Sequence, residues 1–307
     1  MRAGTQRQRG RRRQPRHRSG RAARHRPLDR SDSSATMTST PEDRRGGGMP
    51  IELYSAPGLL EAPVLEVDGS VLFSNVTGGG VFRYADGRAD TMVESRRGIG
   101  GLALHAEGGL LLTGRDVSYA GGDGLRPILT VEGATGFNDV TVGADGSLYV
   151  GVLRHNPQRG EPAGPSEVLR IDPDGVVSTA AADIRWPNGL GFAPDGQTLY
   201  VCEFAESRVL AVCDGETRVF ATAPRGECDG LAVDADGGVW VALGSASAIA
   251  RFDPDGTLDT VIDFPDGFVS SLAFDQNTLY ITTAGRLLSH TVEHAGLPVP
   301  TARIPTP

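Results

Sequence analysis

Lysine is absent from this chain of 307 residues, and cysteine is scarce. Cys202, Cys213 and Cys228 are an odd number and form no C-x-x-C pair, so they indicate neither a disulfide framework nor a structural zinc site. No apolar run approaches the roughly 18 residues that a membrane helix needs. These absences exclude a disulfide-stapled scaffold and a helical membrane anchor. They favour a soluble protein, for which a cytoplasmic location is the default expectation.

Positive charge is concentrated at the N-terminus. Residues 1–48 hold 14 arginines and 4 acidic residues, whereas the rest of the chain holds 16 arginines and 34 acidic residues. An acidic body argues against a nucleic-acid-binding domain, because phosphate contact needs a basic surface. Residues 1–48 have too few apolar side chains to offset the entropy of ordering, so we expect a disordered extension. A basic arm that binds an anionic surface is the alternative.

One pattern recurs six times between residues 51 and 285. An apolar alternating run leads into a tight Asp-Gly-type turn, and a second β-rich run follows, which is a strong local hairpin signal. The turn positions are separated by 39, 38, 50, 41 and 40 residues and are Gly69, Gly108, Gly146, Gly196, Gly237 and Asn277. A period near 40 is typical of propeller blades. The sequence therefore predicts an all-β fold, a six-bladed β-propeller over residues 49–297. A β-sandwich would not explain the period.

The chain ends should meet if the ring is to close. Residues 51–55 are expected to complete the blade that begins with residues 273–282. The Pro-rich end, residues 298–307, is expected to be flexible and to lie outside the ring. The interval of 50 residues contains a polar, Pro- and Gly-rich segment over 153–165. This segment should be a long exposed loop, either a lid over one mouth of the channel or a plain surface insertion.

Oxygen-bearing side chains recur at one offset in the repeat. Eight positions before the turn residue, allowing for the shorter sixth copy, stand Glu61, Gly100, Asn138, Asn188, Asp229 and Ser270. Equivalent positions in successive blades lie on one circle around the axis, so the four larger side chains should face one another. Asn-Gly and Asp-Gly are also ordinary turn dipeptides, so simple capping of the inner strands is the alternative for any one of them.

A cation would explain this convergence. Two carboxylates buried together without a partner cost several kcal/mol. Carboxylate and amide oxygens without His or Cys suit a hard divalent ion, so we expect Ca²⁺ first, with Mg²⁺ or Mn²⁺ behind it. Zn²⁺ is possible, although it usually prefers nitrogen or sulfur ligands. The sequence therefore predicts one divalent metal ion in the central channel.

Four short segments carry a family resemblance across residues 52–285. They are Glu61-Ala62-Pro63, Phe137-Asn138-Asp139, Pro187-Asn188-Gly189-Leu190 and Asp229-Gly230-Leu231-Ala232. In this order, on a repeat of this length, the chain resembles the senescence marker protein, gluconolactonase and luciferin-regenerating enzyme family. The resemblance implies a metal bound by Glu61, Asn188 and Asp229, with Asn138 facing the substrate. It also implies hydrolysis of sugar lactones or related esters.

A mechanism follows as a hypothesis. The metal would act as a Lewis acid on the carbonyl of a small lactone or ester, and Asp229 would be the general base for the attacking water. Arg154 and His155, in the expected loop, are candidate substrate contacts. Arg115 and Asp116 could point toward the channel, although a local ion pair is the simpler interpretation. We expect a small-molecule substrate and neither a nucleic-acid nor a membrane partner. The oligomeric state is open.

Two other functions share this architecture. A non-catalytic propeller could bind a partner on its rim and keep the metal for structure. The second is a strictosidine-synthase-like enzyme that forms a carbon–nitrogen bond, which these motifs support less well. The convergence of polar donors favours hydrolysis, because a purely structural channel could be filled with apolar side chains.

Overall fold

The computed structural model describes residues 48–265 and 267–307, which lie in one compact unit. The extension predicted to be disordered, residues 1–48, falls outside the described residues except for Gly48. Within the described ranges the regular structure is almost entirely β-strand. The helical segments there are two single turns of 3₁₀ helix, η2 (Pro157–Arg159) and η3 (Phe204–Glu206). No helix in these ranges has the length and apolar character to cross a membrane.

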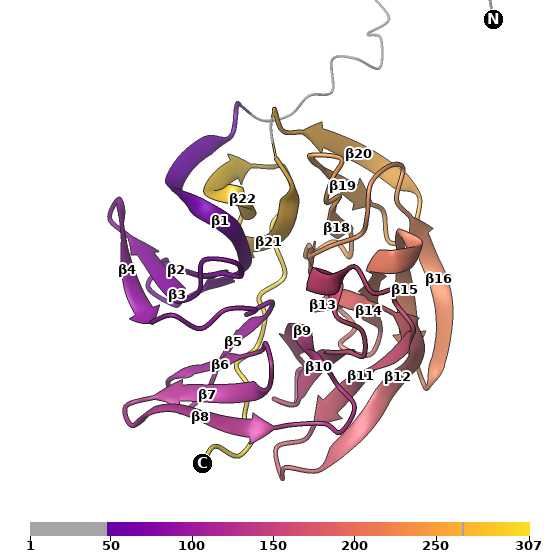
Figure 1. Ribbon diagram of the computed structural model, residues 1–307. Helices are drawn as coiled ribbons and strands as arrows, with labels where there is room; N and C mark the ends of the chain where they lie inside the picture. The colour runs from indigo at the N-terminus through magenta and orange to yellow at the C-terminus, as the bar shows by residue number, and fades with distance from the viewer. Residues whose placement is uncertain (1–47, 266) are drawn as a thin grey trace, which may run out of the picture. The chain divides into compact units, whose positions relative to one another are not determined.

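The strands form five antiparallel sheets arranged around a centre (Figure 1). The first, in the order β21-β22-β1-β2-β3-β4, has six strands: β1 (Ile51–Leu65), β2 (Val71–Asn75), β3 (Val81–Ala85), β4 (Arg88–Val93), β21 (Val269–Asp275) and β22 (Thr278–Thr291). The second has four: β5 (Leu102–Leu104), β6 (Leu110–Leu112), β7 (Val117–Gly121) and β8 (Gly124–Leu129).

The other three sheets also have four strands each, consecutive in the chain. The third contains β9 (Gly136–Val142), β10 (Leu148–Leu153), β11 (Pro165–Ile171) and β12 (Val177–Arg185). The fourth contains β13 (Pro187–Phe192), β14 (Leu199–Glu203), β15 (Arg208–Cys213) and β16 (Glu216–Thr222). The fifth contains β17 (Leu231–Val233), β18 (Val239–Ala242), β19 (Ala248–Phe252) and β20 (Leu258–Asp263).

The all-β propeller-like arrangement is confirmed, but the count of six separate blades is wrong: hydrogen bonding produces five sheets. The reason is the length of β1. Its first part pairs with β22, from Ile51 opposite Ser289, and its last part pairs with β2, from Leu60 opposite Asn75. Two expected blades therefore share one strand and become a single sheet. The expected closure by residues 51–55 is confirmed by the same pairing.

The inner strands form a closed circle. Each of β1, β5, β9, β13, β17 and β21 contacts the next in this order, and β21 contacts β1. The predicted hairpin turns join each inner strand to the following strand, and Gly69 and Gly237 adopt φ values of 85° and 87°, which favour glycine. All inner strands therefore run in the same direction relative to the centre. The inner strands, including the last part of β1 from Leu60, begin at one mouth and end at their turns on the other.

The hydrophobic core lies between neighbouring sheets. In one cluster, Leu111 and Val117 of the second sheet pack with Phe137 and Val150 of the third. In another, Tyr200 of the fourth sheet packs with Val241 of the fifth. Burial of alternating strand residues between adjacent sheets supplies the main driving force for folding. The centre is left to the polar ends of the inner strands.

The C-terminal segment, for which we expected a flexible end, is instead a strap across the turn side of the ring. Residue 297 is hydrogen-bonded to Val233 of the fifth sheet, and Ala302 is hydrogen-bonded to Leu104 of the second, on the opposite side. Figure 1 shows this yellow segment crossing the middle of the unit. The side chains of Ala302 and Ile304 are 0% and 1% exposed. Apolar burial and these backbone bonds hold the segment in place.

Candidate functional site

Irregularities in the inner strands coincide with the repeated polar position. The pairing register shifts between Glu61 and Val64 in β1, opposite Asn138 in β9, between Pro187 and Leu190 in β13, and around Ser270 in β21. A bulge inserts an extra residue, bends the strand and re-aims a side chain. The sequence therefore departs from regular pairing at the level where the polar side chains converge.

Adjacent members of the predicted circle contact one another. A Cβ atom added to Gly100 would lie 2.6 Å from Oδ1 of Asn138, so these two positions are in direct contact. Nδ2 of Asn138 donates a hydrogen bond to the carbonyl oxygen of Pro187 at 3.1 Å. Nδ2 of Asn188 donates to Oδ1 of Asp229. The second, third, fourth and fifth positions of the circle are thus linked in the expected order.

The remaining links close the circle through the first sheet. The carbonyl oxygen of Ser270 accepts the N–H of Gly230 at 2.8 Å, and Oγ of Ser270 donates to the carbonyl oxygen of Leu60 at 2.6 Å. Gly230 directly follows Asp229 in the chain, and Leu60 directly precedes Glu61. Oγ of Ser74 then donates to the carbonyl oxygen of Ile99 at 2.7 Å. These contacts bring the six equivalent positions of the repeat together in their predicted order.

Two acidic side chains of the ring are buried and carry raised pKa values. Glu61 and Asp229 are 8% and 3% exposed. Burial, followed by the charge of Asp139, raises the pKa of Glu61 to about 8. Burial and then the charges of Glu61 and Asp139 raise the pKa of Asp229 well above its usual range. Charging all these groups together at neutral pH is therefore costly without a nearby cation.

Asp139 is a third central carboxylate that sequence reasoning did not single out. It follows Asn138 on β9, its Oδ1 accepts the N–H of Val140 at 2.7 Å, and it also accepts the N–H of Leu190. Burial raises its pKa to about 7. The available signal was the Asn-Asp dipeptide in the aligned copy. The bulge makes this signal hard to use, because regular alternation would aim adjacent residues at opposite faces.

The two residues predicted from the loop differ in their surroundings. Arg154 pairs with Glu167, with Nε 2.9 Å from Oε2, and also donates to a backbone carbonyl, so its charge is already matched. His155 is 3% exposed, and its ring centroid lies 4.7 Å from that of Trp186. Neither ring nitrogen of His155 has a hydrogen-bond partner among the described residues. Burial lowers the pKa of His155, which favours the neutral form. Their roles as substrate contacts stay predictions.

The donor set at the centre fits a hard divalent cation. Glu61, Asn188 and Asp229 together offer two carboxylates and an amide oxygen, and no arginine of the described residues forms an ion pair with Glu61 or Asp229. Oxygen donors of this kind suit Ca²⁺, Mg²⁺ or Mn²⁺. A positive ion would remove the electrostatic cost that raises both pKa values. The residues present therefore fit the predicted metal.

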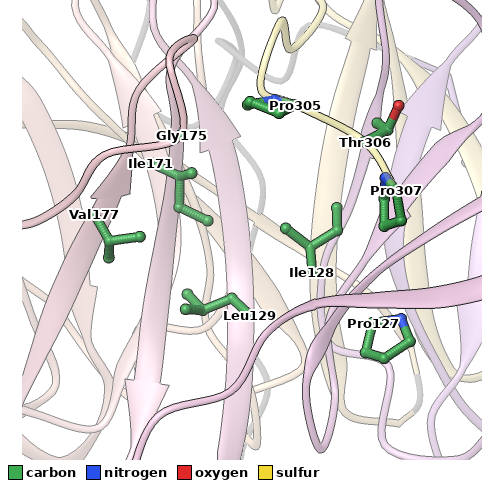
Figure 2. A pocket seen from close by; sticks show the side chains of 9 residues that line it. All are labelled: Pro127, Ile128, Leu129, Ile171, Gly175, Val177, Pro305, Thr306 and Pro307. Atoms are coloured by element: carbon green, nitrogen blue, oxygen red, sulfur yellow. The ribbon is translucent and has the colours of Figure 1, made fainter.

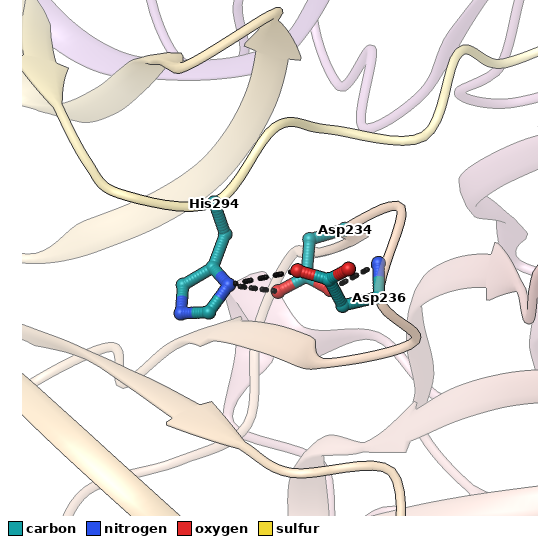
Figure 3. Close-up of side chains that lie close together, drawn as sticks. All are labelled: Asp234, Asp236 and His294. Atoms are coloured by element: carbon teal, nitrogen blue, oxygen red, sulfur yellow. Dashed lines mark hydrogen bonds and ion pairs between the residues drawn. The ribbon is translucent and has the colours of Figure 1, made fainter.

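A second acidic group lies on the turn side, where Asp234, Asp236 and His294 place possible ligand atoms close together (Figure 3). Asp234 already accepts hydrogen bonds from Nε of Arg251 and Nε1 of Trp240, both at 2.9 Å. Nδ1 of His294 lies 3.2 Å from Oδ2 of Asp236. Because the guanidinium already balances the buried carboxylate, this group fits a cation less well than the central ring does.

Two surface pockets lie away from the ring. One, of about 330 Å³, is lined by β8, β11 and the end of the strap, with Ile128, Leu129, Ile171 and Pro305 among its walls (Figure 2). The other, of about 440 Å³, lies between the outer strands of the third and fourth sheets and includes Arg208 and Arg218. Neither pocket is lined by a residue of the central ring. The candidate site is therefore identified by its buried carboxylate and amide groups, and not by the volume of a pocket.

Comparisons with known proteins match this architecture. The chain is 31% identical to pentonolactonase XacC of Haloferax volcanii over 73% of its own length and 81% of the relative's. It is 28% identical to a 6-deoxy-6-sulfogluconolactonase of Pseudomonas putida over 73% and 82% of the two chains. A solved gluconolactonase from Xanthomonas campestris superposes with a TM-score of 0.70 and 26% identity, covering 84% of this chain and 99% of that one.

The family model described as the SMP-30/Gluconolactonase/LRE-like region matches residues 59–285. This range begins just before Glu61 and ends after β21, so it contains every position of the ring. The chain belongs to the SMP-30/gluconolactonase/LRE-like family.

Proposed function

We propose that this protein is a metal-dependent lactonase, a hydrolase of the cyclic ester bond of a small molecule. The observation that carries the proposal is the ring of buried oxygen donors, in which Glu61 and Asp229 lie without a positive partner among the described residues. The names of the related lactonases support the choice of reaction.

Glu61, Asn188 and Asp229 would hold the metal, with Ca²⁺ as first choice and Zn²⁺, Mn²⁺ or Mg²⁺ as alternatives. When bound, such an ion supplies Lewis-acid polarisation of the ester carbonyl. Asp229, a carboxylate at the edge of this site, would accept the proton of the attacking water. The amide of Asn138, fixed between Gly100 and Pro187, orients the substrate.

The test is a lactone panel on the full chain after treatment with a chelator. An aldono-1,5-lactone, an aldono-1,4-lactone and δ-valerolactone are each assayed with Ca²⁺, Mn²⁺, Zn²⁺ or Mg²⁺ restored. We expect at least one cation to restore turnover, and Asp229→Asn to lower it by about 100-fold or more. Asp236→Asn, which alters the acidic group on the turn side, is the matched control and should stay active.

Two results would contradict this function. Turnover that survives complete metal removal would eliminate the metal requirement. Failure to hydrolyse every lactone with every cation would favour a non-catalytic propeller that keeps its ion for structure.

A further inference from the structure

A glycine close to Asn138 admits a loop from the neighbouring sheet. A Cβ atom on Gly136, the first residue of β9, would lie 2.9 Å from the carbonyl oxygen of Gly114 and 3.9 Å from Cα of Arg115. The N–H of Phe137 donates to the same carbonyl oxygen at 2.6 Å. The loop between β6 and β7 therefore fills the space that a side chain at position 136 would take.

Arg96 holds this loop in place. Its side chain is 9% exposed, and its Nη2 donates to the carbonyl oxygens of Thr113 and Asp116 at 3.2 and 3.0 Å. The same nitrogen pairs with Oδ1 of Asp116 at 2.8 Å. Three bonds from one buried guanidinium fix the backbone on both sides of Arg115. The loop is thus preorganised, so that a group it carries can be positioned with little loss of entropy.

Arg115 carries donors that the protein does not use. Its side chain is 83% exposed, and its Nε lies 3.3 Å from Oδ2 of Asp116, a carboxylate already paired with Arg96. Neither Nη1 nor Nη2 of Arg115 forms a hydrogen bond or ion pair within the described part of the chain. A guanidinium offers five N–H donors in a planar fork, so at least two nitrogens are available to a ligand.

The backbone of Arg115 lies beside the candidate site. Its Cα lies next to Gly136, and Asn138 is two residues further along β9, a rise of about 7 Å. The long side chain of an arginine can span that interval. Both residues belong to the mouth at which the inner strands begin, where a substrate would enter the ring.

We propose that Arg115 is a specificity-determining residue that donates hydrogen bonds to an oxygen-bearing substituent of the lactone, remote from the ester being cleaved. This inference rests on the proposed function. The ring holds the ester group, while Arg115 recognises the hydroxyl groups that differ between substrates.

Steady-state kinetics of Arg115→Ala test this role, with a hydroxylated aldonolactone and δ-valerolactone as paired substrates. We expect KM for the aldonolactone to rise roughly 10-fold or more, because a charge-assisted hydrogen bond is lost, while kcat changes little. Both constants for δ-valerolactone should stay within about two-fold, the range expected when no contact is lost. Arg115→Lys should restore part of the difference.

The control is Arg88→Ala, another exposed arginine paired with a neighbouring aspartate, on the outer strand β4. It should change neither substrate's kinetics. Equal effects of Arg115→Ala on both lactones, or no effect on either, would overturn the role of Arg115 while leaving the lactonase proposal intact. Absence of turnover by the wild-type protein would instead contradict the proposed function itself.

Discussion

The side-chain amide of Asn188 donates a hydrogen bond to the carboxylate of Asp229, joining the inner ends of two sheets. The two residues lie 41 positions apart in the chain, which is one repeat. Both are buried, at 6% and 3% exposure. Residues at the same position of successive repeats therefore meet at the centre of the molecule, as this hydrogen bond shows.

Asn188→Ala removes the donor and leaves the buried carboxylate of Asp229 without its partner. We expect the metal-free protein to lose about 1–3 kcal/mol of unfolding free energy, the usual cost of an unsatisfied buried group. Urea denaturation followed by circular dichroism measures this loss. The control is Asn277→Ala, whose amide donates to the carbonyl of Glu293 at the surface. An equal loss of unfolding free energy in both variants would show that the central hydrogen bond stabilises the protein no more than a surface one.

Gly100→Ala tests whether Asn138 must keep its place. The new Cβ would lie 2.6 Å from Oδ1 of Asn138, so the amide has to move. We expect kcat/KM to fall by about 10- to 100-fold, because small displacements of a positioning group are costly, while the thermal midpoint changes little. Gly122→Ala is the control, since a Cβ there meets no atom within 4 Å. Wild-type kinetics in Gly100→Ala would remove Asn138 from the mechanism.

The stability of the metal-free protein should depend on pH in an unusual direction. The pKa of Glu61 is raised from 4.5 to about 8 and that of Asp139 from 3.8 to about 7, while the pKa of Asp229 is also raised. Between about pH 4.5 and 8 these three groups hold more protons in the folded chain than in the unfolded chain, so their contribution to the unfolding free energy falls as pH rises.

Chelator-treated protein should accordingly unfold at lower urea concentration at pH 8 than at pH 5.5. Carboxyl groups whose pKa is lowered, such as that of Asp116, contribute below this window. Burial lowers the pKa values of His155 and His290, which opposes the trend in the acidic part of the window, but the larger shifts of the three carboxyl groups set the sign. Glu61→Gln should flatten the dependence. An unfolding free energy that rises steadily between about pH 4.5 and 8 would show that burial does not raise the pKa values of the central carboxyl groups.

The strap should contribute to the stability of the ring. Ile304→Asp would bury an unpaired charge at a position that is 1% exposed, and we expect a loss of about 3 kcal/mol or more. Differential scanning calorimetry measures the shift. Val299→Asp places the same charge on the exposed crossing segment, at 67% exposure, and should be nearly neutral. A strap that is not firmly packed would leave both variants close to wild type.

The repeat was enough to predict the hairpins, the all-β arrangement and the circle from Glu61 to Ser270, because each depends on local turn chemistry and on a constant offset. The number of separate sheets could not be read in the same way. β1 could have been two strands, one paired with β22 and one with β2. It continues through both pairings because of contacts with β22, whose residues lie more than 200 positions away, such as Ser289 opposite Ile51.

The other departures also have tertiary causes. Ala302 and Ile304 look like part of a polar, Pro-rich end, and only the turns of the second and third sheets provide the surface that buries them. The pairing of Arg154 with Glu167 depends on two strands meeting across a loop. Asp139 reaches the centre through a bulge that breaks alternation. Each of these depends on contacts that no single segment encodes.

A calorimetric titration of chelator-treated protein with Ca²⁺ and Mn²⁺ at pH 8 tests the central claim most directly. The wild-type chain and Asp236→Asn should each bind one divalent ion. Glu61→Gln and Asp229→Asn should lose at least about 100-fold in affinity. Unchanged binding in these two variants, or loss of binding in Asp236→Asn instead, would contradict a metal centre formed by the ring.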